Sequence, residues 1–280
     1  MCAGLGTIGH HLRWLIMVQC HTPQRWLAWA ELPRTLYAIA NLPYCWTQLS
    51  TAPRGDARSI FVIPGIGMTD RSTIVLRHYL RFLGYQVHAW DLGRNLGAKT
   101  IGVHNERLIE RIKSVHHLAQ QPVTLIGWSM GGIMARMVAR RHPQMIRQVI
   151  SLGSPFVGDP FASNAFEIYE RLSGHSLRAP IAQAQIAQSK LPLPVPAISF
   201  YSKSDGIVSW RACLEPNTPT ARNIPVRSAH CSFGFSAEVL LAIADRLAVA
   251  SAGIEPTASR DKQRRPMRIS YDVDRRPEGI

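Results

Sequence analysis

Cysteine is scarce in this sequence, and the patterns in which cysteine binds metals or carries out redox chemistry are missing. The five cysteines form no Cys-x-x-Cys pair and no cysteine–histidine cluster at zinc-binding spacing. We therefore expect no metal and no other cofactor. An odd number of cysteines is typical of a reduced cytoplasmic chain. A disulfide between Cys213 and Cys231 is left open, because both lie near the candidate residues described below.

Long apolar runs and acidic residues are scarce as well. The run 14–18 is too short for a signal peptide, and no stretch approaches the roughly 20 apolar residues of a membrane span. With 18 acidic and 32 basic side chains, the chain has a formal net charge of +14, which attracts it to anionic surfaces. Because the basic residues are scattered rather than gathered with aromatics, we expect no nucleic-acid binding. We expect a cytoplasmic protein that at most lies on a membrane.

Composition divides the chain into three parts. Residues 1–57 form a helical N-terminal segment, 58–250 form one α/β domain, and 251–280 form a polar tail that we expect to be disordered. Residues 10–50 of the first part contain four of the seven tryptophans and three prolines, which indicates two or three short helices. Their aromatic faces either pack on the α/β domain or place residues 1–50 in peripheral contact with a membrane.

In the α/β domain, short runs rich in valine and isoleucine alternate with stretches that have apolar residues at helical spacing. This alternation is typical of βαβ units and predicts a mainly parallel sheet with helices on both faces. The predicted strands are 59–63, 86–90, 123–127, 148–152, 197–201 and 222–226. The predicted helices are 71–83, 104–120, 131–142 and 236–250.

One predicted strand leads into a helix through the sequence Gly127-Trp-Ser-Met-Gly131. A G-x-S-x-G turn in this context projects its serine above the edge of the sheet as a nucleophile. The two glycines are needed because side chains at their positions would collide with neighbouring backbone. The motif therefore predicts Ser129 as the nucleophile of an acyl-transfer reaction.

A serine nucleophile needs a base and a carboxylate that orients the base, and in this type of site they follow the serine in the order acid, histidine. Asp205 follows the strand-like run 197–201, at the carboxyl end where α/β sites gather. His230 follows the next run, 223–226, and precedes the last helix. The sequence thus predicts a catalytic triad of Ser129, His230 and Asp205.

The same reaction needs N–H donors for the negatively charged oxygen of its intermediate. We expect them from the backbone of Met130, directly after the nucleophile, and of Ile66, in the glycine-rich loop after the first strand. Gly65 in that loop, Trp128 and Trp210 are the predicted substrate contacts. The loop lacks the glycine spacing of a dinucleotide site and the Lys-Ser/Thr of a P-loop, so we do not expect it to bind phosphate.

These motifs resemble the α/β-hydrolase superfamily, and within it the lipase-like serine esterases. The resemblance covers about 58–250 and rests on the motifs at 64–67, 91–97, 127–132, 204–208 and 229–231. It implies a three-layer α/β-hydrolase fold with about six strands, ester hydrolysis, and the same triad. The chain departs from larger members in having helix-like sequence, not antiparallel strands, before residue 58.

Residues 156–196 separate two predicted strands and contain helix-like stretches at 161–173 and 180–190. They resemble a small cap or lid that shapes an acyl pocket, and an ordinary crossover helix is the alternative. We predict a hydrolase of small-molecule or lipid esters that acts through an acyl-enzyme. An acyltransferase with the same triad, or a noncatalytic binding protein on this fold, is the alternative. The sequence specifies neither the acyl chain length nor the oligomeric state.

Overall fold

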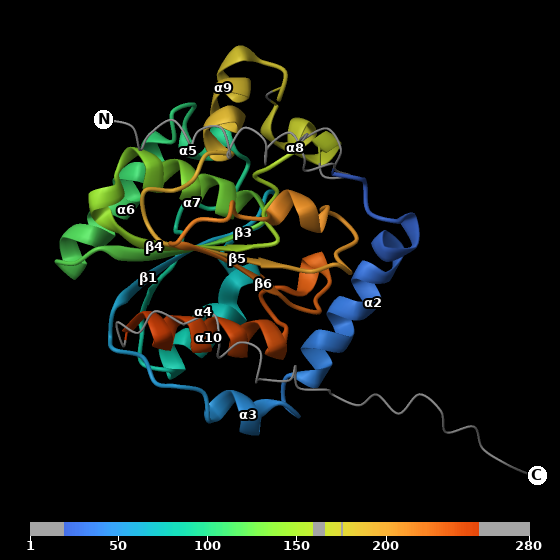
Figure 1. Cartoon of the computed structure of the whole chain (residues 1–280), viewed down its shortest axis with the longest axis vertical. Helices are drawn as coiled ribbons and strands as arrows, with labels where there is room; N and C mark the ends of the chain where they lie inside the picture. The colour runs from blue at the N-terminus through green and yellow to red at the C-terminus, as the bar shows by residue number, and fades with distance from the viewer. Residues whose placement is uncertain (1–19, 159–165, 175, 252–280) are drawn as a thin grey trace, which may run out of the picture.

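The computed structural model describes residues 20–158, 166–174 and 176–251, and its centre is a six-stranded sheet (Figure 1). All neighbouring strands are parallel, and their order is β2-β1-β3-β4-β5-β6. The strands are β1 (Ser59–Ile63), β2 (Gln86–His88), β3 (Val123–Trp128), β4 (Ile146–Leu152), β5 (Ala197–Tyr201) and β6 (Ala221–Pro225). Each of the six predicted strands is therefore present, which confirms the predicted fold class.

Helices cover both faces of this sheet, as Figure 1 shows. One face carries α4 (Ile74–Phe82) and α10 (Ala237–Ser251), and the other carries α5 (Ala98–Ile101), α6 (Glu106–Ala119) and α7 (Met130–Arg141). Strand β3 serves both layers, because successive side chains of a strand point to opposite faces. Ile126 and Trp128 belong to the core under α4 and α10, whereas Val123 and Leu125 belong to the core under α6 and α7.

Short 3-10 helices lie in the connections: η1 (Asp70–Thr73), η2 (Pro143–Met145), η4 (Trp210–Cys213) and η5 (His230–Ser232). Strand β2 ends at His88, two residues before the end of the predicted strand 86–90. The carboxylate of Asp70 accepts the N–H groups of Trp90, at 2.9 Å, and Asp91, at 3.0 Å. Because the N–H groups of Trp90 and Asp91 are bound by the Asp70 carboxylate, they are not available to pair with strand β1, and the pairing of β2 with β1 ends at His88.

The described N-terminal part contains two helices, within the predicted two or three, but the first of them is longer than expected. A single 17-residue helix, α2 (Arg25–Asn41), runs through Pro33, and α3 (Trp46–Ser50) follows. Pro33 removes the hydrogen bond to the carbonyl of Trp29. That residue is 82% exposed, so water can take the bond instead. Helix α2 lies along the side of the molecule next to η5 (Figure 1).

Two helices, α8 (Phe166–Ser173) and α9 (Pro180–Ser189), lie between β4 and β5, where a cap or a single crossover helix was expected. Parts of the expected cap (159–165 and 175), the beginning of the N-terminal segment (1–19) and nearly all of the expected tail (252–280) lie outside the described residues. Among the helices that are described, none has both the length and the apolar character needed to cross a membrane.

Candidate active site

Ser129 lies in the turn between β3 and α7 and has a strained backbone. Its φ of 53° and ψ of −121° fall in a region that residues other than glycine rarely adopt, and such strain typically costs about 1–3 kcal/mol. Two hydrogen bonds hold the turn: the Ser129 N–H donates to the Leu152 carbonyl at 2.8 Å, and the Gly132 N–H donates to the Ser129 carbonyl at 3.0 Å. Backbone strain of this kind is typical of functional sites.

Three glycines allow the turn to pack this closely. A Cβ atom on Gly127 would lie 2.3 Å from the carbonyl oxygen of Gly131, and one on Gly131 would lie 2.4 Å from that of Ile63. The collisions expected from the sequence are therefore confirmed. Gly132 has the same constraint, because a Cβ atom there would lie 2.1 Å from the hydroxyl oxygen of Ser154.

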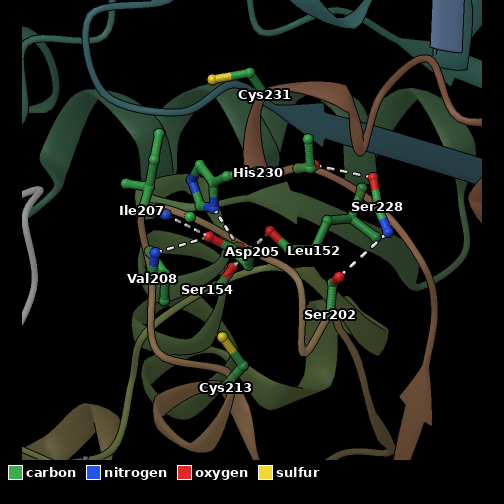
Figure 2. Close-up of polar contacts among 12 residues, drawn as sticks. Leu152, Ser154, Ser202, Asp205, Ile207, Val208, Cys213, Ser228, His230 and Cys231 are labelled. Carbon is green, nitrogen blue, oxygen red and sulfur yellow. Dashed lines mark hydrogen bonds and ion pairs between the residues drawn. The ribbon is translucent and has the colours of Figure 1, made fainter. Parts of the chain in front are cut away.

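Asp205 and His230 form a buried pair at the carboxyl ends of β5 and β6 (Figure 2). The distance from His230 Nδ1 to Asp205 Oδ2 is 2.7 Å, and the two residues are only 4% and 3% exposed. The other oxygen, Asp205 Oδ1, accepts the N–H groups of Ile207 at 2.9 Å and Val208 at 2.7 Å. The carboxylate is thus held from both sides and presents one oxygen to the imidazole.

The electrostatic surroundings raise the pKa of His230 above its ordinary value of 6.5. Burial by itself lowers the pKa, because it disfavours the charged imidazolium. The charge and hydrogen bond of Asp205, together with the charge of Glu31, outweigh that effect. The site therefore stabilises the proton that a catalytic histidine would take up.

The end of strand β4 brings Ser129 close to this pair. Leu152 accepts the Ser129 N–H, and a Cβ atom on the next residue, Gly153, would lie 3.3 Å from His230 Nδ1. The indole N–H of Trp128 also donates to the His230 carbonyl at 3.1 Å. Within the described part of the chain, His230 is hydrogen-bonded to Asp205 but no side-chain hydrogen bond joins it to Ser129.

The loop after β1 lies beside the nucleophile. A turn closes from the Met68 N–H to the Gly65 carbonyl at 3.2 Å, and a Cβ atom on Gly65 would lie 3.4 Å from Ser129 Cβ. Ile66 occupies the second position of this turn, so the turn's own hydrogen bond does not use its N–H. The N–H of Met130 is equally unused by helix α7, because Met130 is its first residue.

Asn95 braces that loop and was not singled out from the sequence. The side-chain NH₂ group of Asn95 donates to the Pro64 carbonyl at 2.8 Å, and the backbone carbonyl of Asn95 accepts the Gly67 N–H at 2.6 Å. Arg94 next to it donates to the Gly67 carbonyl at 2.8 Å. The loop is therefore held in one shape from two sides.

An apolar cavity lies between α7 and the described residues of the 156–196 segment, and Met130 is among its lining residues. It is lined chiefly by aliphatic, thioether and aromatic side chains, among them Ile101, Met130, Ile133, Met137, Phe156 and Ile186. Lys190 is the one charged residue among the described residues that line it. The cavity thus suits a hydrocarbon chain better than a polar group.

The two tryptophans expected to contact substrate pack against other aromatic rings. Trp128 is 1% exposed and packs in the core under α4 and α10, where its ring contacts Phe235 edge to face. Trp210 stacks on Tyr201, with ring centroids 5.6 Å apart, and lies beside Lys203. Neither tryptophan lines the apolar cavity, whereas Gly65 lies next to Ser129.

Cys213 and Cys231 are free thiols that lie on opposite sides of the Asp205–His230 pair (Figure 2). The disulfide left open above is therefore absent. Burial raises the pKa of Cys213 well above its ordinary value, and burial together with Glu31 raises that of Cys231 to about 12. The raised pKa values disfavour the thiolate form, which is the nucleophilic form, in both residues. In the described ranges, no group of three histidine, cysteine or acidic side chains is placed to hold a metal ion.

Comparison with known proteins supports the same fold. A family model described as the alpha/beta hydrolase fold matches residues 100–174. The comparison with curated proteins finds no match. Together with the parallel sheet topology and the strand-to-helix turn at Ser129, this match defines the class of fold: the chain has the α/β-hydrolase fold.

Three solved structures illustrate the likeness, each at 14% sequence identity. The monoacylglycerol lipase of Paleococcus ferrophilus is similar at a TM-score of 0.52, over 71% of this chain and 97% of that one. Lipase B of Aspergillus fumigatus is similar at 0.54, over 68% of this chain and 52% of that one. A metagenome-derived lipolytic enzyme is similar at a TM-score of 0.51, over 72% of this chain and 96% of that one. At this identity the likeness shows the fold alone.

Proposed function

We propose that the protein is a carboxylic ester hydrolase with Ser129 as nucleophile, His230 as base and Asp205 as the partner of the base. The observation that carries the proposal is the strained serine turn beside a buried histidine whose Nδ1 is bound to a carboxylate. A histidine held in this way keeps its proton on Nδ1 and presents the Nε2 lone pair to a hydroxyl group. The three residues follow the carboxyl ends of β3, β5 and β6, at one edge of the same sheet, where α/β sites gather.

In the proposed reaction, His230 takes the proton of the Ser129 hydroxyl as the serine oxygen attacks the ester carbonyl. The carbonyl oxygen becomes negatively charged and accepts hydrogen bonds from the backbone N–H groups of Ile66 and Met130. The C–O bond to the alcohol then breaks, and His230 gives its proton to the leaving alcohol. Water, activated by His230, hydrolyses the acyl-enzyme and releases the acid.

The apolar cavity supports an aliphatic acyl group as part of the substrate. Met130, the residue after the nucleophile, is among its lining residues, and we propose that an acyl chain bound there places its carbonyl at Ser129. We therefore include small-molecule and lipid esters in the proposed substrate class.

We also propose that the N-terminal segment contacts anionic lipid. Trp26, Trp29, Leu32 and Leu36 on α2 are 62%, 82%, 68% and 58% exposed. Exposed aromatic and aliphatic side chains combined with a net charge of +14 favour attachment to an anionic lipid surface. The chain should co-sediment with anionic vesicles and detach as salt rises, and Trp29→Ser should weaken the binding; undiminished binding by that variant would contradict the assignment.

The catalytic proposal is tested by labelling with a fluorophosphonate and by hydrolysis of p-nitrophenyl esters of increasing chain length. Ser129→Ala should abolish both while circular dichroism shows an intact fold, because only the attacking oxygen is removed. Ser114→Ala, which removes an exposed hydroxyl on α6, is the matched control and should leave both unchanged. Labelling that persists in Ser129→Ala would overturn the assignment.

A further inference from the structure

Helix α2 buries a carboxylate against the two turns that carry the proposed acid and base. Glu31 is 5% exposed, and its Oε1 accepts the N–H groups of Gly206 at 2.8 Å and His230 at 2.9 Å. Its Oε2 accepts the N–H of Cys231 at 2.9 Å. Gly206 directly follows Asp205, so one carboxylate binds the backbone of both turns at once.

Backbone donors satisfy this buried charge. A buried carboxylate is costly unless it is paired or hydrogen-bonded. Within the described ranges Glu31 forms no ion pair, and its three N–H contacts are of the short, charge-assisted kind that stabilises an anion. The same three hydrogen bonds therefore stabilise the buried carboxylate and hold the two turns.

The rest of α2 docks closely around the acid's turn. Arg34 donates to the Ser204 carbonyl at 2.6 Å and to the Ser204 hydroxyl at 2.8 Å. A Cβ atom on Gly206 would lie 2.4 Å from the carbonyl oxygen of Leu27. The residues on both sides of Asp205 are therefore in contact with the same helix.

We propose that Glu31 is a positioning residue for the Ser129–His230–Asp205 triad. From helix α2, it fixes the turn that carries Asp205 relative to the turn that carries His230. This inference rests on the proposed function. The 2.7 Å contact between His230 and Asp205 joins side chains from two separate turns, so it is kept only while those turns are kept together. A displacement of about 1 Å in a catalytic arrangement can cost roughly 10²-fold in rate.

Three variants separate positioning from simple packing. Glu31→Ala removes all three contacts, and its kcat should fall about 10²-fold with little change in KM. Glu31→Gln keeps one acceptor oxygen and should lose less. Gly206→Ala pushes α2 away without altering the carboxylate, and it should reproduce the effect of Glu31→Ala. Glu238→Gln is the matched control, because this exposed carboxylate accepts only the Arg227 N–H, at 3.0 Å, in the segment before His230.

A second readout follows from the charges around His230. Among the described residues two carboxylates act on it, Asp205 from the turn after β5 and Glu31 from α2, and the thiol of Cys231 follows it in η5. Because the charge of Glu31 helps raise the pKa of His230, Glu31→Gln should move the acid limb of the kcat/KM profile to lower pH. A residue that only supports packing would leave that limb in place.

The experiment combines these rates with hydrogen exchange at the amides of Gly206, His230 and Cys231. Faster exchange at those amides in Glu31→Gln and Gly206→Ala, with slower fluorophosphonate labelling and an unchanged control, is the expected result. Wild-type exchange and labelling in both variants would overturn the inference, as would a loss of activity in strict proportion to the folded fraction seen by circular dichroism. Failure of the wild-type protein to react with the fluorophosphonate would instead overturn the proposed function, and the exchange data would still decide whether Glu31 holds the turns.

Discussion

Replacing Asp205 with asparagine should nearly abolish activity without disturbing the fold. Asp205 Oδ1 already accepts two backbone N–H groups, so the single oxygen of an asparagine must occupy that position. The NH₂ group then faces His230 Nδ1, which can only accept. The proton of the neutral imidazole moves to Nε2, and the lone pair that should take the serine proton is lost.

The size of the effect follows from that change of tautomer. The corresponding substitution in serine proteases lowers turnover by about 10⁴, which is roughly 5 kcal/mol of transition-state stabilisation. The assay is the rate of fluorophosphonate labelling and of p-nitrophenyl ester hydrolysis at neutral pH. Asp56→Asn, the same change on a carboxylate that is 44% exposed before β1, is the control. An Asp205→Asn protein within tenfold of wild type would refute the reasoning.

Three further predictions concern pH, stability and chain length. Because the pKa of His230 is raised and the neutral imidazole is the base, kcat/KM should rise with pH through a midpoint above 6.5; a pH profile with its acid limb below that value would contradict this. Arg136→Met strands Glu215, its buried ion-pair partner, and should lower the free energy of unfolding by about 3–5 kcal/mol in urea titrations; a loss below 1 kcal/mol would speak against it. Ile133→Trp should fill part of the apolar cavity and shift the preference among p-nitrophenyl esters to shorter chains, whereas an unchanged preference would place the acyl group elsewhere.

The strands were predictable because a parallel sheet covered on both faces needs continuous apolar runs, and such runs stand out in a sequence. β1 and β3 are buried along their whole length, and both were predicted at nearly the observed bounds. The end of β2 was not, since it depends on the distant carboxylate of Asp70. The course of α2 through Pro33 was also missed, because propensity alone argues against a proline within a helix.

Ser129, Asp205 and His230 could be found because each follows a strand in a motif with local meaning. Glu31 has no such motif, and Asn95 lies in the motif at 91–97 but was not singled out within it. Each of the two acts on backbone groups of a segment that is remote in the sequence. A lone acidic residue in an aromatic-rich helix was the available signal for Glu31. Trp128, next to Ser129 in the sequence, was expected to contact substrate, but the alternation of β3 places its ring in the core under α4 and α10.

The contact between α2 and η5 also has a consequence for the order in which the protein assembles. Glu31 and His230 are 199 residues apart in the chain. At about 5–20 residues added per second, Glu31 is synthesised roughly 10–40 s before His230. For most of that interval none of the backbone groups that Glu31 binds, at residues 206, 230 and 231, yet exists, and an isolated helix of this length is marginal in water. Helix α2 is therefore made early and docks late, and a nascent chain that ends before residue 230 lacks two of the three N–H groups that bind its buried carboxylate.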